Sequence, residues 1–134
     1  MTEEINNQKR LLLVDDDEIH LTSAELMLKD EYEIFKATSG KEALEFLAKS
    51  QILPDLILLD IVMLEMDGWE VFRRIKAIAI YRDIPIVFLT SVDEDGEKRK
   101  AMKLGAAEYI TKPFDMAYLR TTIKNILENK TQSV

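Results

Sequence analysis

The chain has 134 residues, of which 25 are acidic and 18 basic, giving a net charge of −7 and no cysteine. This length suits one domain with a sizeable core, while the acidic balance disfavours direct binding to nucleic acid or to an anionic membrane. The missing cysteine excludes disulfides and zinc–thiolate sites, and no apolar segment approaches the length of a membrane span, so we expect a cytoplasmic protein.

Continuous apolar runs alternate with helical patterns along the chain. Strands that are covered on both faces of a parallel sheet are apolar without interruption. The predicted strands are Arg10 to Val14, Tyr32 to Ala37, Leu56 to Leu59, Ile86 to Leu89 and Ala107 to Thr111. This alternation predicts an α/β fold, a flavodoxin-like doubly wound (βα)5 with a five-stranded parallel sheet in the order 2-1-3-4-5.

Helices are expected between the strands, and several begin at residues that can cap them. Ser39 and Glu42 have the spacing of a capping box, and Asp67 and Asp115 can cap the third and fifth helices. The first helix is expected over Glu18 to Lys29 and the fourth over Glu97 to Leu104. The whole chain is predicted to be one domain, with a core at about residues 9–128 and frayed polar ends at 1–8 and 129–134.

Polar residues follow four of the five predicted strands directly. Asp15 and Asp16 follow the first strand, Asp60 the third, Thr90 the fourth and Lys112 the fifth. Because ligands of open α/β sheets bind at the carboxyl ends of the strands, we expect these side chains to converge. Two carboxylates 4 Å apart repel by roughly 4 kcal/mol at an effective dielectric near 20, so a cation must compensate. Hard oxygen ligands favour Mg²⁺, and a lysine and a hydroxyl beside it suit a phosphoryl group.

Four sequence strings at these strand ends resemble one known family. The chain is similar to the receiver domain of two-component response regulators, of the single-domain, CheY-like kind. The resemblance covers about Lys9 to Leu127 and is found in VDDDE at Val14 to Glu18, LLDIVMLEMDG at Leu58 to Gly68, FLTS at Phe88 to Ser91 and YITKPF at Tyr109 to Phe114. Four motifs in the family's order, within one domain, form a specific signal.

The resemblance implies a chemical role for each of these strand-end residues. Asp60 would be the phosphoacceptor, and Lys112 and Thr90 would contact the phosphoryl oxygens. Asp15, Asp16 and Asp60, with the backbone carbonyl of Val62, would hold Mg²⁺. The Lys112–Pro113 bond would be cis. A carboxylate can form an aspartyl phosphate, and this transfer needs mainly positioning and charge neutralisation.

The resemblance also implies a signalling switch rather than an enzyme with a separate substrate. A sensor histidine kinase or a phosphotransfer protein would donate the phosphoryl group, and the chain would catalyse only its own phosphorylation and dephosphorylation. Thr90 and Tyr109 would then move and alter the surface formed by the fourth helix, the fifth strand and the fifth helix. That surface would bind a downstream protein, with the chain a monomer or a phosphorylation-dependent dimer.

Two other functions remain open on the residues alone. In a haloacid-dehalogenase-like phosphohydrolase, Asp15 would be the nucleophile and Asp17 the general acid, but Asp60 would then have no role. A scaffold that is never phosphorylated is the other alternative. For single residues, we expect Asp17 to cap the first helix, His20 to have no chemical role and Trp69 to pack at the surface. Leu64 stands where the family pattern usually has proline.

Overall fold

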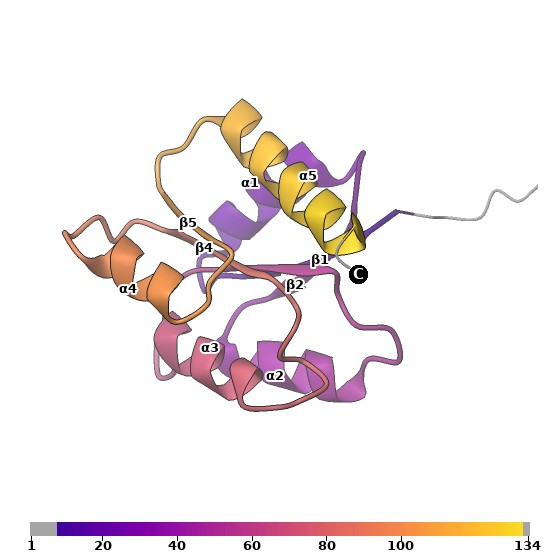
Figure 1. The fold of residues 1–134 in the computed structure, drawn as a ribbon, viewed down its shortest axis with the longest axis horizontal. Coiled ribbons are helices and arrows are strands. Elements are labelled where there is room, and N and C mark those ends of the chain that lie inside the picture. Colours follow the sequence, from indigo (N-terminus) through magenta and orange to yellow (C-terminus); the bar gives the residue numbers. More distant parts are fainter. Residues whose placement is uncertain (1–7, 133–134) are drawn as a thin grey trace, which may run out of the picture.

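The computed structural model describes residues 8–132. Five parallel strands form one sheet in the order β2-β1-β3-β4-β5, which confirms the predicted doubly wound fold (Figure 1). The strands are β1 Arg10–Val14, β2 Glu33–Ala37, β3 Leu56–Leu59, β4 Ile86–Thr90 and β5 Glu108–Thr111. The helices are α1 Glu18–Leu28, α2 Gly40–Lys49, α3 Gly68–Lys76, α4 Glu97–Lys103 and α5 Met116–Gln132. No described helix has both the length and the apolar character that a membrane crossing would require.

The sheet is buried on both faces, as its uninterrupted apolar strands require. Every residue of β3 and β4 is buried. Figure 1 shows α1 and α5 on one face and α2 and α3 on the other. Leu119, Ile123 and Leu127 of α5 pack on the first face, whereas Val71 and Ile75 of α3 belong to the cluster on the second. The central strands are therefore held in place, and so are the residues that follow them.

Side chains at the helix starts satisfy the free backbone N–H groups there. The Ser39 Oγ accepts a hydrogen bond from the Glu42 N–H, and the Asp67 carboxylate accepts one from the Glu70 N–H, both at 3.0 Å. Glu42 in turn accepts from the Thr38 N–H at 2.6 Å, one residue before the Ser39 N–H that a capping box uses, so the reciprocal bond is displaced by one residue. These bonds confirm the two predicted caps and fix where α2 and α3 begin.

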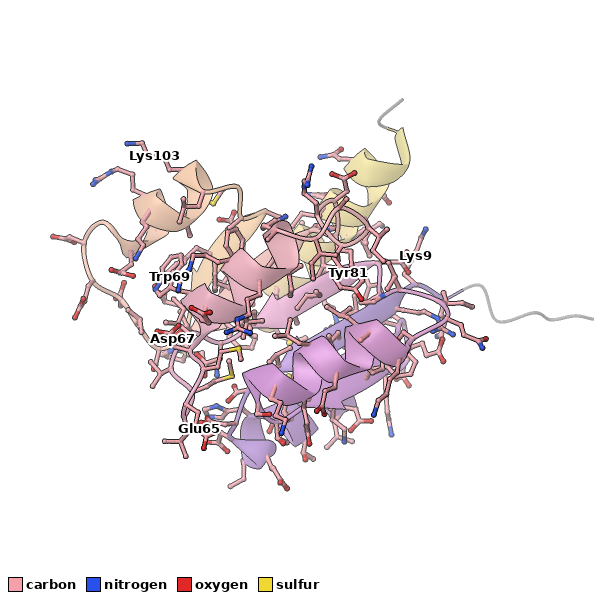
Figure 2. All side chains as sticks on the ribbon, turned by 90° about the horizontal axis from the view of Figure 1, so that it is seen from below. Lys9, Glu65, Asp67, Trp69, Tyr81 and Lys103 are labelled. Carbon is pink, nitrogen blue, oxygen red and sulfur yellow. The ribbon has the colours of Figure 1, made fainter. Side chains whose placement is uncertain are left out.

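Two expectations from the sequence are wrong. Helix α5 continues to Gln132, through residues 129–132 of the expected frayed end. Extending an existing helix costs little, so polar residues after the buried Leu127 can continue it. Trp69, labelled in Figure 2, is buried with 9% of its surface exposed, because its ring centroid lies 4.9 Å from that of Phe88 and 4.2 Å from the Lys100 ammonium. The expected frayed ends at residues 1–7 and 133–134 lie outside the described residues.

Candidate functional site at the carboxyl ends of the strands

Backbone hydrogen bonds continue past the ends of the strands and bring the polar residues together. The Asp60 N–H donates to the Val14 carbonyl at 3.0 Å, and the Lys112 N–H donates to the Thr90 carbonyl at 2.8 Å. Val14 and Leu59 are partners in the register of β1 and β3, so Asp15 and Asp60 follow side by side. We call Asp15, Asp16, Asp60, Thr90 and Lys112 the strand-end site.

Lys112 is the cation of the strand-end site, and it is bonded more closely to one acid than to the other. Its Nζ lies 2.8 Å from Asp15 Oδ2 and 3.8 Å from Asp60 Oδ2. The three side chains are largely buried, with 16% of Lys112 and 10% of each aspartate exposed. Because buried charges need partners, the lysine stabilises the two carboxylates together.

Burial works against the negative charge of the Asp60 carboxylate. Burial raises the pKa of Asp60 above its ordinary value, and the Asp15 carboxylate raises it further. Hydrogen bonds from the Thr90 hydroxyl and the Ile61 N–H, together with the Lys112 charge, lower this pKa but do not cancel the effect of burial. The Ile61 N–H donates to Asp60 Oδ1 at 2.7 Å. The Asp60 side chain is therefore oriented by fixed donors and remains short of positive charge.

The departure from the family pattern at Leu64 has a structural consequence. The Leu64 N–H donates a hydrogen bond to Asp16 Oδ2 at 3.0 Å, across 48 residues of sequence. A proline at this position has no N–H and could not make the bond. The loop after β3 and the acidic turn after β1 are thus joined directly through the Asp16 carboxylate, while the Leu64 side chain is 81% exposed.

The expected switch residues lie on β4 and β5 and connect to the loop after β4. Thr90 is completely buried, and Tyr109 is 4% exposed. The Tyr109 hydroxyl donates to the Val92 carbonyl at 2.7 Å, and its ring lies 6.0 Å from that of Phe88. Burial and the nearby acidic side chains of Glu97 and of the loop before α4 raise the pKa of Tyr109 to about 12. The phenol is therefore a proton donor at neutral pH and ties β5 to the loop that follows Thr90.

The donor set of the site suits a hard divalent cation. Within residues 8–132, no three acidic or histidine side chains lie close enough to hold a metal ion by themselves. Mg²⁺ does not need such a cage, because it is usually held by one or two carboxylates, retains waters and takes phosphate oxygens. Asp15, Asp16 and Asp60 supply carboxylate oxygens against the single charge of Lys112. Oxygen donors of these residue types fit magnesium chemically.

Asp17 and His20 lie beside this cluster. The Asp17 side chain accepts from the Ile19 N–H at 2.9 Å and caps α1, as expected. His20, for which we expected no chemical role, has Nδ1 3.0 Å from Lys112 Nζ. The sequence offers no signal for this contact, because proximity between residues 92 positions apart depends on the packing of α1 against the end of β5.

A cavity of about 490 Å³ opens at the strand-end site between α1 and the start of α5. Asp15, Asp60, Lys112, Ser91 and His20 form its polar part, and leucines of the central strands are among its apolar lining. The small Ser91 side chain leaves space in front of Asp60. The Lys112–Pro113 bond at its rim is cis, as the resemblance implied.

Gly68 fixes the distance between α3 and Asp60, and we expect Gly68→Ala to destabilise the fold strongly. A Cβ at Gly68 would lie 2.2 Å from the Asp60 carbonyl oxygen and 2.7 Å from the Ile61 Cα. Backbone atoms cannot rotate away, so we expect a loss of about 3 kcal/mol, measured by urea unfolding. Gly40→Ala is the matched control at the first residue of α2, because the atoms nearest to its Cβ would belong to the Val71 and Met66 side chains rather than to backbone. Equal losses in the two variants would contradict this account.

Comparison with known families supports what the geometry indicates. A family model described as the response regulator receiver domain matches residues 11–124. The chain is 37% identical over 90% of its length to the response regulator PleD of Caulobacter vibrioides. It is 35% identical over 89% of its length to the alkaline phosphatase synthesis transcriptional regulatory protein PhoP of Bacillus subtilis. The chain spans 26% of the length of PleD and 48% of that of PhoP.

Solved structures agree with this family match. A CheY-like response regulator receiver domain protein from Methanospirillum hungatei superposes with a TM-score of 0.84 at 27% identity, covering 96% of this chain and 100% of that one. The chemotaxis protein CheY4 of Vibrio cholerae gives a TM-score of 0.79 at 28% identity, covering 88% of this chain and 98% of its own.

Proposed function

The chain belongs to the response regulator receiver domain family, whose members act as signalling switches in two-component systems, and we propose that Asp60 is its phosphoacceptor. One observation carries this proposal. Asp60 is a buried carboxylate with a raised pKa, placed between a buried hydroxyl and an ammonium at the mouth of a cavity. Asp15, by contrast, is already bonded to Lys112 at 2.8 Å.

The proposed step is a transfer between two protein side chains. An oxygen of Asp60 bonds to the phosphorus of a donor phosphohistidine, the phosphorus–nitrogen bond breaks, and the leaving imidazole keeps the electron pair and takes a proton. Lys112 and the Thr90 hydroxyl are placed to stabilise the phosphoryl oxygens. Mg²⁺, when held by Asp15, Asp16, Asp60 and the Val62 carbonyl, would supply further positive charge to those oxygens.

The output of the switch is proposed to run from Thr90 to the surface of α4, β5 and α5. A phosphoryl group on Asp60 adds negative charge and three acceptor oxygens. Thr90 would turn toward them, and the loop that Tyr109 holds through the Val92 carbonyl would follow. Such a change biases an existing equilibrium between two arrangements of one fold. Tyr109 is already buried in this structure, so the proposed change at Tyr109 does not consist of an exposed ring becoming buried.

Partners follow from the family. Receiver domains work with histidine kinases and downstream targets, and we propose a sensor histidine kinase or phosphotransfer protein as donor and a protein as target. Phosphorylation-dependent dimerisation through the α4, β5 and α5 surface, a cytoplasmic location and a single-domain chain stay predictions. Because the chain matches the receiver domain family over residues 11–124, the phosphohydrolase alternative is not retained.

The test is a phosphorylation reaction with a small donor. The protein is incubated with phosphoramidate or acetyl phosphate and Mg²⁺, and the modified peptide is identified by mass spectrometry. We expect the added phosphoryl mass on Asp60. A label on Asp15 would support the phosphohydrolase, and complete inertness with retained partner binding would support a scaffold.

A further inference from the structure

We infer that His20 is a positioning residue for Lys112. This inference deepens the proposed function and rests on it, because Lys112 is the group expected to contact the transferred phosphoryl oxygens. His20 is the only histidine of the chain and lies in the first turn of α1, with half of its side chain exposed.

The Lys112 ammonium lies between two acceptors on the β1–α1 side of the site. Its Nζ is 3.0 Å from His20 Nδ1 and 2.8 Å from Asp15 Oδ2, and these two acceptors are themselves 3.4 Å apart. An ammonium has three protons to donate. Two of them are used here, and the third remains for the Asp60 side, where the carboxylate oxygen is 3.8 Å away.

The other ring nitrogen of His20 indicates which tautomer makes this contact. His20 Nε2 lies 3.5 Å from Asp17 Oδ2, one α-helical turn before it. Nδ1 also faces the Asp15 carboxylate at 3.4 Å, but the Lys112 ammonium is closer, at 3.0 Å, and an ammonium can only donate, so Nδ1 keeps its lone pair and the proton lies on Nε2. Nε2–H directed at Asp17 therefore leaves Nδ1 as an acceptor for the Lys112 ammonium. Asp17, which caps α1, lies on the opposite side of the ring from Lys112.

A neutral acceptor can orient the Lys112 ammonium without neutralising its charge, which Asp15 cannot do. Asp15 neutralises the ammonium charge as it binds it, and Asp15 is also a proposed ligand of Mg²⁺. An oxygen shared with a divalent cation holds an ammonium less tightly. His20 orients Lys112 without cancelling its charge and without being a proposed metal ligand, so the lysine keeps a fixed position and its full charge for the phosphoryl group.

Three substitutions of His20 test whether Lys112 needs an acceptor at the position of Nδ1 or whether any side chain of similar size is enough. In His20→Asn the amide oxygen takes the place of Nδ1, in His20→Gln it takes that of Nε2, and in His20→Leu neither acceptor remains. Thr22→Leu, at an exposed position of the same helix, is the control for changes in α1 itself. Thermal unfolding of each variant checks that the fold is retained.

The first readout needs no metal and no phosphoryl donor. In ¹⁵N-labelled protein at 5 °C with EDTA, base-catalysed exchange removes the signal of a free ammonium, whereas an ammonium held by fixed acceptors exchanges its protons slowly enough to give a side-chain NMR signal. We expect the Lys112 signal in the parent, His20→Asn and Thr22→Leu, and its loss in His20→Leu and His20→Gln. Lys112→Arg assigns the signal.

The second readout is the rate of Asp60 labelling by phosphoramidate with Mg²⁺. Because one hydrogen bond to the Lys112 ammonium is lost, Asp60 labelling should be about fivefold slower in His20→Leu and His20→Gln, with His20→Asn close to the parent. An unchanged signal and rate in His20→Leu, or an equal loss in all three His20 variants, would overturn the inference. If the parent is not labelled on Asp60, the proposed function fails, and the metal-free signal still decides whether His20 holds Lys112.

Discussion

Asp60→Asn should abolish phosphorylation by small donors completely. A carboxamide keeps the size and hydrogen-bonding shape of the carboxylate but is not a nucleophile toward phosphorus, so no acyl phosphate can form. The measurement is the intact mass of the protein after incubation with phosphoramidate and Mg²⁺. Asp95→Asn, at an exposed position of the loop before α4, is the matched control and should be labelled like the parent. Labelling of Asp60→Asn at the parent's rate would show that another residue accepts the phosphoryl group.

The same variant should be more stable than the parent at neutral pH in EDTA. The pKa of Asp60 is raised in the folded protein, mainly by burial, so the folded state binds its proton more tightly than the unfolded state does. At pH values above both pKa values, the charged carboxylate therefore costs stability. As the pH falls through the folded pKa toward the unfolded one, the parent regains this stability and the difference shrinks. Thermal unfolding from pH 7 to pH 4 measures it, and a lower Tm for Asp60→Asn at pH 7 would contradict the assignment.

Lys112→Met should reduce the rate of Asp60 labelling by about 10²–10³-fold, the range found when a preorganised group facing transition-state charge is removed. Methionine fills a similar volume but offers no positive charge to the phosphoryl oxygens. Lys112→Arg should recover only part of the rate, because a planar guanidinium cannot place its donors where a compact ammonium does. Initial rates of labelling by intact mass measure both.

The control for Lys112 is Lys103→Met on α4, which removes an exposed lysine from the same sequence region. Lys112→Met leaves Asp15 and Asp60 facing each other without a cation, so its thermal unfolding is measured alongside its rate. A loss smaller than tenfold in a folded Lys112→Met would mean that this lysine does not stabilise the transferred group.

The sheet and the place of the site could be predicted from local sequence. Uninterrupted apolar runs such as Leu56 to Leu59 are stable only when both faces of a strand are covered, which requires helices on both sides. In a parallel sheet the carboxyl ends of all strands lie at one edge. An acid or a lysine that directly follows such a run must therefore lie at that edge, and Asp15, Asp60 and Lys112 do.

The partners of these side chains could not be predicted in the same way. Lys112 is bonded to Asp15 rather than to Asp60, the Asp16 carboxylate is bound by the Leu64 N–H, and Trp69 is buried against Phe88. Each contact joins residues that are far apart in the sequence, 97 positions in the case of Asp15 and Lys112. The Lys112 Nζ is 1.0 Å closer to the Asp15 carboxylate than to the Asp60 carboxylate, and a difference of this size depends on how helices and loops pack on the sheet.

The sequence by itself therefore determined the fold class, the edge of the sheet that bears the chemistry and the residue types found there, because periodicity and strand ends are local properties. Only the tertiary structure decided which side chains lie within hydrogen-bond distance of the Lys112 ammonium, His20 among them. The physical reason is that a hydrogen bond requires an approach within about 3 Å, and such a distance between separate elements is set by side-chain packing across the whole domain.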